Sequence, residues 1–143
     1  GARVLDLCAG SGALGLEAAS RGAGDVTLVD SSRTATETCR RNIQALGLRR
    51  VRVVTAKAAT FLAGAAGAPV DLALLDPPYE LNEEGLTSLL TLLARSKDPW
   101  LAPHAVVVVE RSTRSPEPTW PQGMERFADR RYGETTTWFA EPV

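Results

Sequence analysis

The sequence predicts an α/β protein with a mostly parallel sheet and helices on both faces. Short apolar segments of strand length alternate along the chain with segments whose apolar residues recur at helical spacing. Repeated strand–helix–strand units place successive strands parallel, with the connecting helices packed against the sheet. Two final strand segments separated by a tight turn require antiparallel pairing, which we expect at one edge of the sheet.

A first strand and helix flank a glycine-rich segment. The strand is expected over Arg3–Cys8, because its residues are mostly apolar. The helix is expected over Gly12–Arg21, where Leu14, Ala18 and Ala19 recur at helical spacing and would face inward.

The second unit joins a strand over Asp25–Asp30 to a helix over Ser32–Leu46. Serine hydroxyls accept hydrogen bonds from the free N–H groups at a helix start, so Ser31 or the serine after it would cap this helix. The valine-rich segment Val51–Thr55 is a third strand.

The remaining elements follow the same alternation. A short helix over Ala58–Ala65 and a break rich in glycine precede an apolar strand over Val70–Asp76. Leucines at helical spacing predict a helix over Asn82–Arg95, and consecutive valines predict a buried strand over Ala105–Glu110. The two closing strands, expected to form the antiparallel pair, are Arg126–Tyr132 and Thr135–Ala140.

Composition excludes several classes of protein. The 143 residues suffice for one domain, and 44% hydrophobic with 23% charged residues is usual for a globular chain. No apolar run approaches the roughly 20 residues of a membrane helix, and no secretory signal opens the chain. Cys8 and Cys39 form no metal or redox motif, and His104 is the only histidine, so we expect a cytoplasmic protein without a metal site.

Positive charge is concentrated in one segment although the net charge is −1. No aspartate or glutamate occurs between Thr38 and Val70. This segment is either a solvated helix end and turn or a surface that faces phosphates. Its basic residues are Arg40, Arg41, Arg49, Arg50, Arg52 and Lys57.

The glycine-rich segment predicts a nucleotide-binding turn. Gly10-x-Gly12-x-x-Gly15 satisfies the dinucleotide fingerprint, and Asp30 lies where a ribose-binding carboxylate is expected. Asp6 in the preceding strand favours a ligand with a cationic ammonium group over a pyrophosphate, which it would repel. Both aspartates also have structural interpretations, since either could accept N–H groups of the turn or of a helix start.

A second motif, Asp76-Pro77-Pro78-Tyr79, ends the fourth parallel strand. Ligands of open α/β sheets bind at the carboxyl ends of the strands. There a carboxylate and a backbone carbonyl would accept from an amine, and the aromatic ring would stack on a flat base. A dinucleotide enzyme has no need for this motif, which therefore favours a methyltransferase that acts on amino groups.

In this order the motifs resemble class I methyltransferases that use S-adenosyl-L-methionine. More closely, the chain is similar to the RsmD family of bacterial 16S ribosomal RNA guanine-N2 methyltransferases. The resemblance implies a Rossmann-like fold of seven strands with an antiparallel C-terminal strand, over one domain spanning residues 1–143. The matching stretches are Val4–Gly24, Val26–Asp30, Asn42–Leu48, Thr60–Leu62, Val70–Tyr79, Val107–Arg111 and Arg131–Thr135.

The resemblance also implies roles for individual residues. Asp76 and the carbonyl of Pro77 would hold the target amine, Pro78 would stiffen the loop, and Tyr79 would stack on a flipped guanine. The residues that would bind the cofactor are Asp6, Ala9, Gly10, Ser11, Gly12, Asp30, Ser31, Lys57, Ala58 and Asp76.

The chain departs from the family in two places. The family carries a basic N-terminal segment that helps hold RNA, so we expect that the chain lacks a native N-terminal extension. The family pattern has Asp or Asn where this chain has Lys57, and a lysine cannot accept a hydrogen bond from an adenine amino group. The adenine would then be held by backbone groups near Ala58, or cofactor affinity would be weaker.

The expected partner is 16S rRNA in the small ribosomal subunit, with the protein acting as a monomer, without a membrane or metal. An adenine-N6 methyltransferase acting on DNA or RNA is the nearest alternative, because it would use the same motif. An NAD-dependent oxidoreductase and a non-catalytic RNA-binding module are alternatives from other classes.

Overall fold

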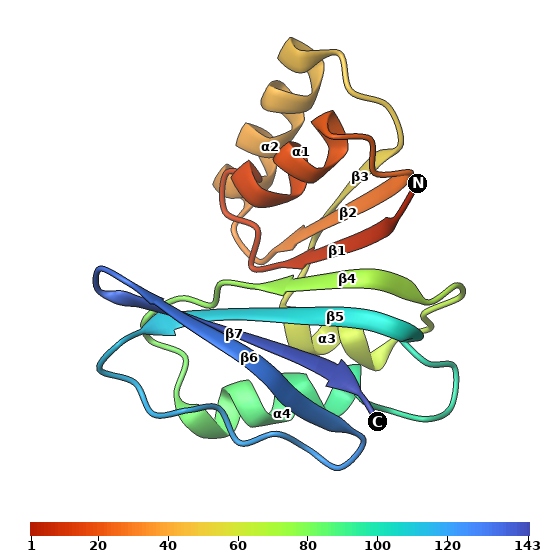
Figure 1. Cartoon of the computed structure of the whole chain (residues 1–143). Helices are drawn as coiled ribbons and strands as arrows, with labels where there is room; N and C mark the ends of the chain where they lie inside the picture. Colours follow the sequence, from red (N-terminus) through yellow and green to blue (C-terminus); the bar gives the residue numbers. More distant parts are fainter.

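A seven-stranded sheet organises the computed structural model, which describes residues 1–143 (Figure 1). The strand order is β3-β2-β1-β4-β5-β7-β6, in which β1 to β5 are parallel and only β7 runs in the opposite direction. The predicted fold class is confirmed. The strands are β1 Arg3–Leu7, β2 Asp25–Asp30, β3 Val51–Thr55, β4 Val70–Leu75, β5 Leu101–Ser112, β6 Met124–Tyr132 and β7 Thr135–Pro142. The helices are α1 Ala13–Ser20, α2 Arg33–Leu46, α3 Ala58–Ala63 and α4 Glu83–Leu93.

The two faces of the sheet are covered by different helices (Figure 1). Alternate residues of a strand point to opposite faces, so β1 serves both. Leu5 and Leu7 pack in the larger core, together with the leucines of α4. Val4 packs in the smaller core with Leu16 of α1 and Cys39 of α2. Figure 1 shows α1 and α2 above β1, β2 and β3, and α3 and α4 beneath the sheet.

Most predicted elements are confirmed, and the differences lie at their ends. The fifth strand begins at Leu101 rather than at Ala105, because its pairing with β4 starts before an irregularity in register. The prediction that Leu14 faces inward is wrong, since its side chain is 43% exposed while Leu16 is buried. No helix is long and apolar enough to cross a membrane.

Gly15 lies where α1 packs closely against the sheet. A Cβ atom built there would collide with Leu28 of β2 and lie 3.1 Å from Oδ2 of Asp6. Both neighbours are buried, with 0% and 2% exposure, so neither can move aside.

We therefore expect Gly15→Ala to destabilise the protein by about 1–3 kcal/mol, the usual cost of overpacking a core. The gain in helix propensity, about 1 kcal/mol, does not offset it. Urea denaturation measures the difference, and Ser20→Ala at the exposed end of the same helix is the control. Equal stability of the two variants would contradict the close packing described here.

Candidate active site

The predicted glycine turn lies at the carboxyl end of β1 and is bonded to β2. Ala9 N–H donates to the carbonyl of Val29 at 2.9 Å, and Gly10 N–H donates to Oδ2 of Asp30 at 2.9 Å. Gly12 has a φ of 86°, a conformation that suits glycine, and it precedes the first turn of α1. The turn and the end of β2 therefore form one unit, as the motif spacing predicts.

Asp30 uses both carboxylate oxygens within the protein. Besides Gly10, it accepts from the backbone N–H of Ser32 at 2.8 Å. Ser32, and not Ser31, caps α2, because its hydroxyl accepts from Ala35 N–H at 3.2 Å. Ser31 is exposed beside this carboxylate. Ribose binding by Asp30 stays a prediction, and its free lone pairs still allow it to accept from hydroxyl groups.

Asp6 is the most perturbed group of the site. It is 2% exposed, and its Oδ2 accepts from Gly15 N–H at 3.1 Å. Burial raises the pKa of Asp6 to about 7, and the charges of Asp76 and Asp30 add to the rise. This contact with α1 is the structural role expected of Asp6 as an alternative, in which its carboxylate accepts an N–H group near the helix start. A role in binding an ammonium group stays a prediction.

The Asp-Pro-Pro-Tyr motif follows β4 directly, as predicted. Pro77 is buried, whereas Asp76 and Pro78 are exposed, and the Tyr79 side chain is 93% exposed. Loss of part of its hydration raises the pKa of Asp76. An exposed carboxylate and a free aromatic ring are thus presented together on a loop stiffened by two prolines.

An arginine that sequence analysis overlooked fastens this loop. Arg111 of β5, whose side chain is 8% exposed, donates to the carbonyl of Leu81 at 3.2 Å and pairs with Glu83 at 2.8 Å. Leu81 N–H in turn donates to the carbonyl of Pro78 at 3.0 Å. The segment after the motif is therefore tied to both β5 and the start of α4.

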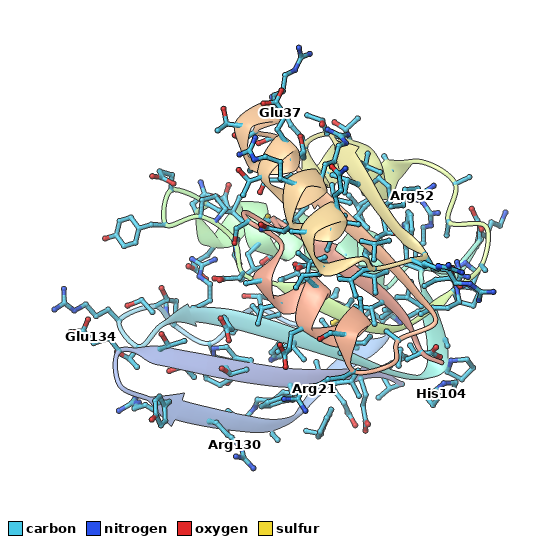
Figure 2. All side chains as sticks on the ribbon, turned by 90° about the horizontal axis from the view of Figure 1, so that it is seen from above. Arg21, Glu37, Arg52, His104, Arg130 and Glu134 are labelled. Atoms are coloured by element: carbon cyan, nitrogen blue, oxygen red, sulfur yellow. The ribbon has the colours of Figure 1, made fainter.

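A cleft of about 860 Å³ opens beside the motif. Its walls come from the motif loop, the end of β5 and the turn between β6 and β7. In Figure 2, Glu134 of that turn and His104 of β5 lie at opposite ends of the molecule. The lining residues are Asp76 to Glu83, Glu110 to Ser112, Arg114, Ser115, Glu134 and Thr135.

Ser11 is exposed in the glycine turn, where its carbonyl accepts from the Asn42 amide at 3.1 Å, and two further predicted cofactor residues lie at the start of α3. Lys57 occupies the N-cap position, is exposed, and has no side-chain bond to the helix. Ala58 begins the helix and is half-buried. Both follow β3, whose carboxyl end lies at the same edge of the sheet as those of β1 and β2. The structure assembles no group of three or more His, Cys, Asp or Glu residues suited to a metal ion.

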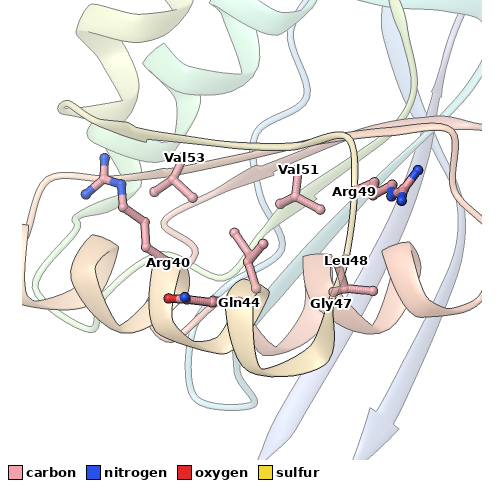
Figure 3. A pocket seen from close by; sticks show the side chains of 8 residues that line it. Arg40, Gln44, Gly47, Leu48, Arg49, Val51 and Val53 are labelled. Carbon is pink, nitrogen blue, oxygen red and sulfur yellow. The ribbon is translucent and has the colours of Figure 1, made fainter.

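A second groove, of about 460 Å³, lies between α2 and β3 (Figure 3). Arg40 and Arg49 stand at its two ends, and Val51 and Val53 form part of its floor. None of the exposed arginines of this region pairs with a carboxylate. These are Arg40, Arg41, Arg49, Arg50 and Arg52.

The strand order, with β7 reversed between β5 and β6, is that of Rossmann-like methyltransferases. Two solved structures superpose on the chain. One is yhhF of Escherichia coli, with a TM-score of 0.87 and 33% identity, covering 99% of this chain and 76% of that chain. The other is TrmN of Thermus thermophilus, with a TM-score of 0.80 and 28% identity, covering 100% and 44% respectively.

Sequence comparison then places the chain within this class. A family model described as conserved hypothetical protein 95 matches residues 1–141, and the chain belongs to this family, the RsmD family. It is 35% identical over 135 residues to ribosomal RNA small subunit methyltransferase D of Escherichia coli K12, covering 93% of this chain. It is 34% identical over 116 residues to the protein of the same name from Haemophilus influenzae, covering 78% of this chain. The chain spans 65% and 58% of the lengths of these two relatives.

The raised pKa of Asp6 makes stability depend on pH. The folded state holds this proton more tightly than the unfolded chain does, since the usual value is 3.8 and the folded value about 7. The stabilisation is complete below about pH 4 and is lost as the pH rises through about 7. Asp6→Asn keeps a neutral acceptor for Gly15 N–H and avoids this loss.

We therefore expect the free energy of unfolding of Asp6→Asn, relative to the unsubstituted chain, to increase between pH 4.5 and pH 7.5. Urea denaturation at several pH values measures it. The exposed Asp129→Asn is the control and should show no such trend. A difference independent of pH would contradict the raised pKa of Asp6.

Proposed function

We propose that this protein transfers a methyl group from S-adenosyl-L-methionine to the exocyclic N2 amine of a guanine in 16S rRNA. The observation that carries the proposal is the Asp76–Tyr79 motif, presented at the end of β4 in a chain of the RsmD family. Two curated relatives named as ribosomal RNA small subunit methyltransferases support the substrate. Such a protein would act in the cytoplasm as one catalytic domain and as a monomer.

The charged residues at the carboxyl ends of the parallel strands fit the proposed cofactor. Besides burial, which is the main cause, the charges of Asp76 and Asp30 raise the pKa of Asp6, so a cation placed among the three carboxylates would be favoured. S-adenosyl-L-methionine supplies a methyl group made electrophilic by its sulfonium, and it also carries an ammonium group. Asp6 and Asp30 would hold its cationic and ribose parts, beside the turn Ala9–Gly12 and Ser31.

The fit is weaker around the adenine. Lys57 presents an ammonium group, which donates and cannot accept, so it would not bind the adenine amino group. Backbone groups at Ala58 remain to do so, and this part of the site is expected to contribute less affinity than the carboxylates.

The motif residues would act on the substrate amine. An exocyclic amine is a poor nucleophile because its lone pair is delocalised into the ring. Asp76 and the carbonyl of Pro77 would accept its two N–H bonds, orient the nitrogen and stabilise the positive charge that develops on it. Tyr79 would stack on the flipped base, which is worth about 1–3 kcal/mol. Arg111 keeps the loop in place through Leu81 and Glu83, so the acceptors need not reorganise.

The arginine-rich edge supports RNA as the substrate. Five exposed arginines without carboxylate partners lie on the second half of α2, on β3 and in the turn between them, which is the pattern expected of a surface that contacts phosphates. The proposal thereby favours the phosphate-facing interpretation of this segment over a merely solvated one.

We expect Asp76→Ala to lower the rate of methyl transfer about 100- to 1000-fold, because it removes an acceptor aimed at developing charge. The assay uses small ribosomal subunits that lack the modification, with nucleoside mass spectrometry as readout. S-adenosylhomocysteine lacks the sulfonium charge that Asp76 would face, so its affinity, measured by calorimetry, should stay within about threefold. The matched control is Glu80→Ala, which removes an exposed carboxylate near the motif.

The same measurements separate the alternatives. Formation of N6-methyladenosine instead of N2-methylguanosine would favour the adenine methyltransferase. Binding of NAD but not of S-adenosylhomocysteine would favour the oxidoreductase. RNA binding that neither cofactor nor Asp76→Ala affects, without any methylated product, would favour the non-catalytic module.

A double substitution, Arg40→Gln with Arg49→Gln, tests the arginine-rich edge. Each arginine that contacts a phosphate contributes about one to the slope of log affinity against log salt, so the slope for 16S rRNA should fall by about two. The control is Arg130→Gln with Arg131→Gln on β6, at the opposite edge of the sheet (Figure 2). Equal losses in both double variants would show that net charge alone is responsible.

A further inference from the structure

Of the cleft carboxylates that bond to no other residue, Glu110 is the half-buried one, and the proposed chemistry gives it no task. Glu110 lies near the end of β5 and lines the cleft together with Asp76. It is half-buried, and its side chain takes part in none of the hydrogen bonds or ion pairs of the structure. Its neighbour Arg111, the nearest cation in sequence, is engaged with Glu83 instead. Its carboxylate is therefore free to accept hydrogen bonds from a ligand in the cleft.

Strand register sets Glu110 next to Asp76. Leu75 of β4 is paired in parallel with Val109 of β5, and Asp76 and Glu110 are the residues that follow them. Neighbouring strands lie about 4.8 Å apart, so the two carboxylates leave the sheet side by side. Leu75 and Val109 belong to the larger core, and strand alternation therefore turns the next residues toward the opposite face.

Electrostatics agree with this placement. Burial raises the pKa of Glu110, and the charge of Asp76 raises it further. Two adjacent carboxylates offer acceptors only, and they repel each other until a ligand brings donors to both.

We propose that Glu110 selects guanine by accepting the N1–H of the base, while Asp76 and the Pro77 carbonyl accept its N2 amine. The inference rests on the proposed function and adds the group that distinguishes the base. On the Watson–Crick edge of guanine, N1–H and the N2 amine are adjacent donors. They match the two adjacent carboxylates of the cleft.

The same arrangement rejects adenine. The amine of adenine is adjacent to an unprotonated N1, which is a hydrogen-bond acceptor. The Glu110 carboxylate would then face N1 with lone pairs on both sides and no proton between them. A polar site left unpaired by the wrong substrate discriminates far better than an apolar pocket does. The Asp-Pro-Pro-Tyr motif serves methylation of both guanine N2 and adenine N6. Glu110 would make the site specific for guanine.

The test compares Glu110→Ala and Glu110→Gln with Glu134→Ala, which removes another carboxylate lining the same cleft. The substrate is small ribosomal subunits lacking the modification, and the product is N2-methylguanosine measured by mass spectrometry. Glu110→Ala should lower kcat/KM at least about tenfold, with S-adenosylhomocysteine affinity within about twofold. Glu110→Gln should recover part of the loss, since its amide oxygen still accepts. Glu134→Ala should leave kcat/KM within about twofold.

A pH profile separates recognition from a structural role. The unsubstituted protein should lose kcat/KM as the pH falls and Glu110 takes up a proton, and Glu110→Gln should lose less over the same range. Unchanged kcat/KM in Glu110→Ala, or an equal loss in Glu134→Ala, overturns this inference alone. N6-methyladenosine as the product of the unsubstituted chain also overturns it. Absence of any methylated nucleoside overturns the proposed function, and the inference with it.

Discussion

The hydrogen bond between Asp6 and Gly15 is the contact on which the arrangement of the site at the carboxyl ends of the strands depends. It joins the carboxyl end of β1 to the first turn of α1, across the glycine turn that connects them. A side chain at Gly15 would push α1 away from β2, and the turn that connects to Asp30 would move with it. The fold therefore keeps a carboxylate in its interior, with the pKa raised to about 7, to hold the first helix at close range.

Parallel pairing explains why so many acidic groups meet at one edge. Strands that run in the same direction end on the same side, so residues at the ends of β1, β2, β4 and β5 converge although they are far apart in sequence. Asp6, Asp30, Asp76 and Glu110 are brought together in this way. Their mutual repulsion opposes folding, and a bound cation or donor-rich base relieves it. Binding of the proposed cofactor and base would therefore be coupled to the repulsion among these carboxylates.

Sequence analysis recovered the strands, the strand directions and both motifs, because each is encoded within a few consecutive residues. It missed the pairing of Arg111 with Glu83, which lie 28 positions apart on different elements and carry no local pattern. On α1, Ala18 and Ala19 face the smaller core as predicted, but Leu14 does not, because apolar periodicity counts leucines and gives no weight to Gly15, which packs against the sheet. The relation of Glu110 to Asp76 required the register of β4 and β5, which the sequence does not reveal.

The position of β7 has a consequence for how the chain folds. This strand is the last in sequence, yet it lies between β5 and β6, and it supplies all the sheet contacts of β6. Without residues 135–142, one edge of β5 would be unpaired and β6 would have no strand to pair with. Unpaired edges invite association with other chains. Because β7 joins β6 to the rest of the sheet, truncation within β7 would cost two strands instead of one.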